Sequence, residues 1–169
     1  MKGIDVSKDG VTYLPNSKPC FICGEENPAG VHVRFCVEDG IVKAPFTAKS
    51  HHCGFDNVVH GGVVAALLDE CMGWAVAREI HRMCFTGELT VRYLKQVPAN
   101  RPMTACSEVM KANRRISTAR GWIVDDEGVE YARAEGRFIP LSVEGTLEVD
   151  DNLLYHGDEE RVFDCLREQ

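Results

Sequence analysis

Residues 61–81 form the only long segment of this chain with the composition of an α-helix. The segment contains no proline and is rich in strong helix formers, among them Ala65, Ala66, Leu67 and Leu68. Strand-like runs stand on both sides of it. A single helix among many strands excludes an alternating α/β fold, which needs a helix between successive parallel strands. We therefore expect an α+β fold in which a curved antiparallel sheet of about six strands wraps around one long central helix.

The strands are indicated by alternating apolar and polar residues, with turn signals between the runs. The expected strands are 31–38, 41–48, 84–97, 102–112, 115–125 and 129–140. Asp39-Gly40 is a hairpin signal between the first two strands, and residues 126–128 supply a turn between the last two. Because the connections between the last four strands are short, we expect antiparallel neighbours.

The 169 residues suffice for one domain with a full hydrophobic core. We expect an N-terminal arm at 1–19, a globular domain at 20–140 and a C-terminal extension at 141–169, with a short amphipathic helix within 158–168. The longest apolar run, Val63–Leu68, is far shorter than the ~20 residues that span a bilayer. The first residues also lack the apolar stretch of an export signal. We therefore expect a cytoplasmic protein without a membrane partner.

The charge and the cysteines restrict the partners further. A net charge of -7 argues against nucleic acid, because proteins that bind a phosphate backbone concentrate Lys and Arg. Without an export signal, we expect the eight cysteines to be reduced thiols. Cys20 and Cys23 have the spacing of a metal-ligand pair, which His51, His52 or Cys53 would have to complete. Because one such pair is a weak zinc signal, we expect no metal and no other cofactor.

Two carboxylates fall within the apolar part of the expected helix. On a helical wheel, Arg78, Glu79 and Arg82 mark the solvated side, whereas Asp69 and Glu70 lie more than about 120° from its centre. Burial of a carboxylate without a partner is costly, so such groups are usually either paired or functional. The residues alone leave both interpretations open.

The start of this helix adds a second feature. His60-Gly61-Gly62 stands where free backbone N–H groups and the helix dipole favour negative charge. Two glycines allow a ligand oxygen to approach these N–H groups, as in an oxyanion hole. The same residues also fit a simple hinge with a hydrogen-bonded His60. An anion site combined with a buried acid two turns along the same helix favours the functional interpretation.

The run HGGVVAALLDE, residues 60–70, resembles the signature of hotdog-fold acyl-CoA thioesterases. The branch that it most resembles is the phenylacetyl-CoA-thioesterase-like group of the 4-hydroxybenzoyl-CoA thioesterase superfamily. Further matches are CFICG at 20–24 with Asn27-Pro28, and TGELTVRY at 86–93 followed by Val97-Pro98. The resemblance covers about residues 20–140 and implies a hotdog domain there. It also implies a homodimer or homotetramer with active sites at the dimer interface.

Members of this family hydrolyse acyl-CoA thioesters without a metal or other cofactor, since CoA is part of the substrate. The resemblance implies that Asp69 is the catalytic carboxylate and that the Gly61 N–H polarises the thioester carbonyl. It places His60 near the thioester. It also implies that the hydroxyl of Thr86, from the neighbouring subunit, helps to hold the attacking water.

The loop before the helix departs from the family pattern. Cys53 stands where many relatives have glutamine, and Asn57 stands where many have glycine. Asn57 is a further candidate for the catalytic site, because asparagines in this loop reach the site in some relatives.

The phosphates of CoA require local positive charge. We expect Gly62 to contact the CoA moiety, together with Lys111, Arg114 and Arg115 ahead of the fifth strand, since arginine binds phosphate bidentately. The three cations fit a solvated hairpin end as well.

Two mechanisms are compatible with these residue types. Asp69 acts either as a general base towards water or as a nucleophile through a mixed anhydride. We expect Glu70 to face a different wall of the helix. Hydrolysis of an acyl-CoA thioester is the function that we expect, and the alternatives are an acyl-thioester hydratase or dehydratase on the same fold and a non-catalytic acyl-CoA-binding domain.

Overall fold

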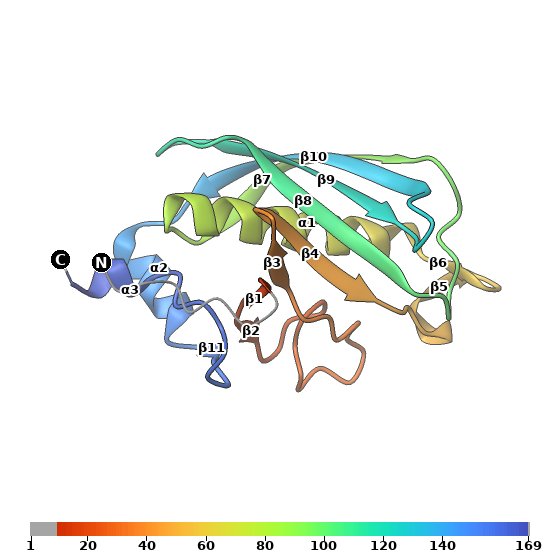
Figure 1. Ribbon diagram of the computed structural model, residues 1–169, viewed down its shortest axis with the longest axis horizontal. Coiled ribbons are helices and arrows are strands. Elements are labelled where there is room, and N and C mark those ends of the chain that lie inside the picture. Colours follow the sequence, from red (N-terminus) through yellow and green to blue (C-terminus); the bar gives the residue numbers. More distant parts are fainter. Residues whose placement is uncertain (1–9, 169) are drawn as a thin grey trace.

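One antiparallel sheet and one long helix make up most of the molecule (Figure 1). The computed structural model describes residues 10–168. The strands of the sheet follow the order β1-β3-β4-β8-β9-β10-β7. Their bounds are β1 Thr12–Tyr13, β3 Cys36–Glu38, β4 Ile41–Phe46, β7 Cys84–Tyr93, β8 Met103–Lys111, β9 Ser117–Val124 and β10 Glu130–Pro140. Helix α1, Gly61–Ile80, contacts β4, β7, β8, β9 and β10. The predicted hotdog architecture is confirmed, with seven strands in place of about six.

Smaller elements lie at the two ends of α1 (Figure 1). They are β2 Asn16–Ser17 paired with β11 Leu153–Leu154, β5 Cys53–Phe55 paired with β6 Val58–Val59, a 3₁₀ turn at Ser50–His52, and the helices α2 Val143–Asp150 and α3 Asp164–Arg167. In the described residues 10–168, no helix is both long and apolar enough to cross a bilayer.

The alternation along each strand places one face of the sheet against α1. In β9, Ala119 and Ile123 are fully buried, whereas the intervening Arg120 is exposed. A Cβ atom at Gly121 would lie 3.1 Å from Met72 Cγ of α1 and 3.2 Å from a backbone carbonyl oxygen. The helix therefore packs against β9 at a distance that favours glycine at this position.

The predicted helix and hairpin agree closely with the structure. The helix ends at Ile80, because His81 adopts the left-handed conformation (φ 51°) that commonly terminates a helix. Asp39 and Gly40 both have positive φ, at 52° and 79°, as a two-residue hairpin turn between β3 and β4 requires.

The predicted strand at 31–38 is too long. Only residues 36–38 pair within the sheet, because the N–H groups of Val31 and Val33 donate to the carbonyls of Phe21 and Ile22 instead. The alternation was nevertheless a correct guide to burial. The residues of this segment that are buried are Val31, Val33, Phe35 and Val37.

The two ends of the chain differ most from expectation. Residues 12–17, predicted to belong to a loosely ordered arm, form β1 and β2, and residues 1–9 of that arm lie outside the described residues. Helix α2 was not predicted; it begins after Ser142, whose side chain accepts a hydrogen bond from the Gly145 N–H (3.0 Å). The helix expected within 158–168 is confined to Asp164–Arg167.

The packing of α1 gives a first prediction. Leu68 is fully buried, so Leu68→Ala should lower the free energy of unfolding by about 2–5 kcal/mol, because it leaves a cavity that the sheet cannot fill. The control is Met110→Ala on β8, where the side chain is 54% exposed and the expected change is below about 1 kcal/mol. Urea denaturation followed by circular dichroism measures both. Equal losses in the two variants would contradict this account of the core.

Candidate active site

A pocket of about 380 Å³ lies between α1, the beginning of β7 and the turn at residues 20–24. Much of its wall is apolar, and includes Ala66, Trp74, Met83 and Phe138. Its polar lining side chains are Ser17, Cys20, Asp69, Glu70 and Thr86. The expectation that Glu70 faces a different wall from Asp69 is therefore wrong, since consecutive helical residues differ by only about 100° in direction.

Asp69 is partly buried in this wall and has one hydrogen-bond donor. The Thr86 hydroxyl donates to Asp69 Oδ1 at 2.6 Å. Burial raises the pKa of the Asp69 carboxyl, and the hydrogen bond from Thr86 opposes that rise. The carboxyl group is thus oriented by Thr86 and has little contact with water, which suits a group that accepts a proton from a bound molecule.

A β-bulge brings Thr86 to this position. Glu88 pairs with Arg137 on β10, but the next pair joins Thr86 to Phe138, so Gly87 is the extra residue. Because Phe138 is buried against α1, its partner Thr86 also points to that face. The bulge therefore turns the hydroxyl towards Asp69 of the same chain, whereas the role implied for Thr86 of a neighbouring subunit, to hold the attacking water, stays a prediction.

The beginning of α1 is capped by His60. Its Nδ1 atom accepts a hydrogen bond from the Gly62 N–H at 2.9 Å, so Gly62, expected to contact CoA, has its N–H engaged. The Gly61 carbonyl accepts from the Tyr93 hydroxyl at 2.8 Å. Within residues 10–168, no acceptor is recorded for the Gly61 N–H. His60, Gly61 and Tyr93 line a second pocket of about 560 Å³.

The two pockets are separate within one chain. Asp69 follows Gly61 by eight residues, which corresponds to about 12 Å along the helix axis. A single thioester group cannot contact the Gly61 N–H and the Asp69 carboxylate of the same chain at once. The structure therefore brings Asp69 and Thr86 together, and His60, Gly61 and Tyr93 together, but does not join the two groups.

Asn57 belongs to neither pocket. It lies in the exposed turn between β5 and β6 with a φ of 57°, and its carbonyl accepts a hydrogen bond from the Ala99 N–H. The turn is part of a shallow hollow that contains neither Gly61 nor Asp69. Within one chain, Asn57 is therefore not brought to the candidate catalytic carboxylate.

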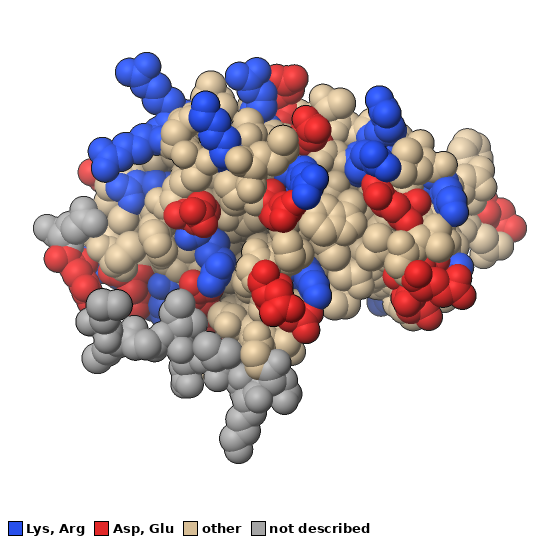
Figure 2. Space-filling view, turned by 45° about the horizontal axis from the view of Figure 1, so that its top comes forward, with Lys and Arg blue, Asp and Glu red and all other residues tan. Residues whose placement is uncertain are grey.

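The three cations expected to bind CoA are exposed at the end of the β8–β9 hairpin. Ser117 pairs with Phe138, which pairs with Thr86, so the hairpin end lies about two strand spacings, or roughly 10 Å, from Thr86. Lys111, Arg114 and Arg115 do not line the pocket that contains Asp69. Figure 2 shows a group of basic side chains at the upper left of the view, and others dispersed among acidic ones.

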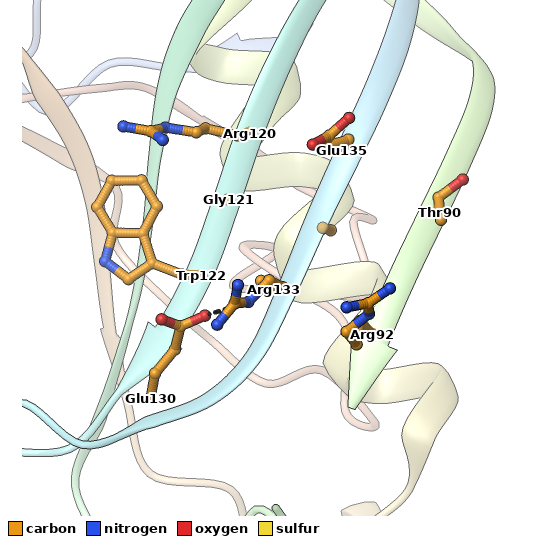
Figure 3. A pocket seen from close by; sticks show the side chains of 9 residues that line it. Thr90, Arg92, Arg120, Gly121, Trp122, Glu130, Arg133 and Glu135 are labelled. Atoms are coloured by element: carbon orange, nitrogen blue, oxygen red, sulfur yellow. Dashed lines mark hydrogen bonds and ion pairs between the residues drawn. The ribbon is translucent and has the colours of Figure 1, made fainter. Parts of the chain in front are cut away.

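A hollow of about 600 Å³ lies on the outer face of the sheet (Figure 3). Sequence reasoning did not predict it, although the outward positions of β9 and β10 carry the signal. Its charged and aromatic lining residues are Arg92, Arg120, Trp122, Glu130, Arg133 and Glu135. Arg133 pairs with Glu130, and Arg120 pairs with Glu108. The sheet separates this hollow from Asp69, and its charges are mixed.

The Cys20–Cys23 turn meets a residue that was not predicted as its partner. Cys20 Sγ lies 2.8 Å from Glu70 Oε2. Burial, together with the neighbouring Cys20, raises the pKa of Glu70. Of the residues expected to complete a metal site, His52 has both ring nitrogens engaged, with the Lys49 N–H and the Ala29 carbonyl.

Comparison with known proteins finds similarity to thioesterases. Residues 56–132, which include α1, β7, β8 and β9, match the sequence model of the thioesterase superfamily. The crystal structure of a thioesterase superfamily protein is 30% identical, with a TM-score of 0.67 over 72% of this chain and 63% of that chain. Residues 56–132 are thus similar to the thioesterase superfamily. This confirms the resemblance to hotdog-fold thioesterases.

Two further solved structures are similar to this chain. The BH2602 protein from Bacillus halodurans, solved with CoA, is 26% identical, with a TM-score of 0.54 over 59% of this chain and 66% of that chain. The PaaI protein of the E. coli phenylacetic acid degradation operon is 16% identical, with a TM-score of 0.61 over 66% of this chain and 81% of that chain, and shows a similar fold. No protein with a curated description matches the chain. The chain spans 63% of the thioesterase superfamily protein and 66% of the BH2602 protein, which is less than two thirds of each.

The cap at His60 gives a second prediction. His60→Ala removes the acceptor of the Gly62 N–H, so we expect the free energy of unfolding to fall by about 0.5–2 kcal/mol. His60→Asn is the matched control, because asparagine is a preferred N-cap residue and should restore most of the loss. Thermal and urea denaturation measure both. Equal stability of His60→Ala and the wild type would show that the cap contributes nothing.

Proposed function

We propose that this protein hydrolyses acyl-CoA thioesters with Asp69 as the catalytic carboxylate. The observation that carries the proposal is the Thr86–Asp69 hydrogen bond in the wall of a largely apolar pocket. The match of residues 56–132 to the thioesterase superfamily supports the reaction class, and the similar BH2602 protein was solved with CoA. The apolar wall suits an acyl chain, and the buried carboxylate suits proton transfer.

The proposed steps follow from the free atoms of Asp69. Because Thr86 donates to Oδ1, Oδ2 is available to accept a proton from a bound water. The water oxygen attacks the thioester carbon, and the carbonyl oxygen becomes an oxyanion that a backbone N–H stabilises. The C–S bond then breaks, and the CoA thiolate takes the proton from Asp69. Direct attack by Oδ2 through a mixed anhydride uses the same atoms and remains the alternative route.

The oxyanion donor comes from a second copy of the chain in this proposal. In residues 10–168, β7 is the last strand of its sheet and pairs only with β10, so its other edge is available. Antiparallel pairing of two β7 strands about their midpoint places Thr86 of one copy opposite Val91 of the other, two residues from Tyr93. The Tyr93 hydroxyl donates a hydrogen bond to the Gly61 carbonyl of its own chain. A two-fold dimer thus brings the Asp69–Thr86 pair of one chain close to the Gly61 N–H of its partner.

A third prediction tests the carboxylate. Asp69→Asn retains the shape of the side chain but removes the base, so kcat should fall by about 10²–10⁴-fold. Release of CoA thiol from short aliphatic, long aliphatic and aromatic acyl-CoAs measures the loss and defines the substrate class. Glu108→Gln, on the outer face of β8, is the control and should retain wild-type activity. Wild-type protein that binds acyl-CoA without turnover would favour the non-catalytic alternative.

A fourth prediction tests the Gly61 N–H. Gly61→Pro removes this donor, and proline is well tolerated at the first residue of a helix. His60 already has the extended conformation that a following proline requires (φ −58°, ψ 135°). We expect Gly61→Pro to lower kcat by about 10²–10³-fold. Gly61→Ala, which introduces a Cβ but keeps the N–H, should retain most of the activity, and equal losses would exclude the N–H as the donor.

Mixed dimers of the two inactive chains test the shared site. When Asp69→Asn and Gly61→Pro chains are refolded together, each heterodimer has one site with both residues intact. Random pairing then restores about a quarter of the wild-type activity for a two-fold dimer. No recovery, with heterodimers demonstrated by two affinity tags, would show that each chain supplies its own Gly61 and Asp69.

A further inference from the structure

Three ionisable side chains outside the proposed reaction meet where the N-terminal turn contacts α1. Their ligand atoms, Cys20 Sγ, Cys23 Sγ and a Glu70 carboxylate oxygen, all lie within 4.8 Å of one another. A tetrahedral Zn²⁺ ion holds sulfur and oxygen ligands about 3.6–3.8 Å apart. Cys20 Sγ and Glu70 Oε2 are 2.8 Å apart and would have to separate, whereas any pair near the 4.8 Å limit would have to contract, each by about 1 Å or less, to surround one ion. We propose that Cys20, Cys23 and Glu70 bind a divalent ion of the zinc type.

The backbone of the turn already points at the sulfur atoms. The N–H groups of Ile22 and Cys23 donate to Cys20 Sγ at 3.2 and 3.5 Å, and the Ser17 N–H donates to Cys23 Sγ at 3.4 Å. Such donors stabilise the thiolate form, which is the form that binds a metal. Both sulfur atoms thus have the second layer of contacts that a metal site requires.

Gly24 permits the tight turn that holds the two sulfur atoms together. Its N–H donates to the Cys20 carbonyl at 2.9 Å. A Cβ at this position would lie 2.3 Å from the Cys20 carbonyl oxygen and 2.5 Å from that of Lys18. Since both contacts are with backbone atoms, any larger residue would force the turn to open.

The charge of the cluster favours a cation. Among residues 10–168, Glu70 forms no ion pair with lysine, arginine or histidine, although it is largely buried in α1. Cys20 and Cys23 are free thiols. Three groups that ionise to anions therefore share one partly buried site without a positive side chain. A divalent cation compensates this charge, and two thiolates with a carboxylate suit a borderline-soft ion.

The proposed ion has a position for a fourth ligand. Cys20 and Glu70 line the same pocket as Asp69, so that position is accessible to water or to a molecule bound there. Three protein ligands with one open position is the arrangement of reactive zinc sites, whereas purely structural sites use four. The ion also joins the 20–24 turn to α1 and thereby fixes one wall of the pocket. It is independent of the route by which Asp69 acts.

Direct binding of Co²⁺ tests this proposal without an activity measurement. Reduced, chelator-treated protein without a histidine tag is titrated with Co²⁺, whose thiolate ligands give near-ultraviolet charge-transfer absorption. We expect one equivalent of Co²⁺ to bind per chain, to be displaced by one equivalent of Zn²⁺, and to be confirmed by elemental analysis.

The variants test the individual ligands. Cys20→Ser should halve the absorption, and Glu70→Gln should keep the absorption but weaken Co²⁺ binding by about 10-fold or more. Cys36→Ser, which alters a cysteine on the outer face of the sheet, is the control and should bind as the wild type does.

The wild-type titration decides the question even when a variant fails to fold. Reduced, folded wild-type protein that takes up no Co²⁺ or Zn²⁺ overturns the proposal. So does charge-transfer absorption that persists unchanged in a folded Cys20→Ser variant. Because hydrolysis by Asp69 is measured separately, an inactive protein that binds the ion and an active protein that does not are distinct results.

Discussion

The close packing of α1 against the concave face of the sheet determines where every other part of the molecule lies. A Cβ at Gly121 would meet Met72 and Leu68 of the helix, and Gly136 on β10 lies beneath Phe138 and Met72 in the same way. Because most of the sheet covers one side of α1, the pocket beside the two carboxylates is enclosed by the N-terminal turn, the beginning of β7 and residues of α2 and β11. The pocket that contains Asp69 is therefore a consequence of which side of the helix the sheet leaves uncovered.

The order of the main elements was predictable because it depends on local patterns. One helical segment among alternating runs permits few arrangements, and the turn at Asp39-Gly40 has the backbone conformation that these residues favour. The position of Asp69 on the helix followed from periodicity alone. The direction of the Thr86 side chain could not be predicted in this way, because it depends on the extra residue Gly87 in a β-bulge. Such a bulge is visible only once the pairing of β7 with β10 is known.

Long-range contacts explain the remaining differences. Val31 and Val33 have the alternation of a strand, yet their N–H groups pair with the 20–24 turn, which no local pattern indicates. The same turn carries Cys20 to Glu70, fifty positions later in the sequence. The spacing of the cysteines was evident from the sequence, but the carboxylate that meets them depends on how the turn packs on α1. Helix α2 was missed for a similar reason, since its cap at Ser142 follows directly on a strand.

The separation of Gly61 and Asp69 by eight positions has a consequence for how the proposed activity depends on protein concentration. Their separation along the helix is about 12 Å, so in the proposed mechanism a separated chain carries both halves of a site and completes neither. Catalysis per chain then follows mass action: it decreases on dilution as dimers dissociate, although each chain keeps its fold. The distance between Gly61 and Asp69 along the helix axis would thus make the activity depend on the concentration of the protein in the cell.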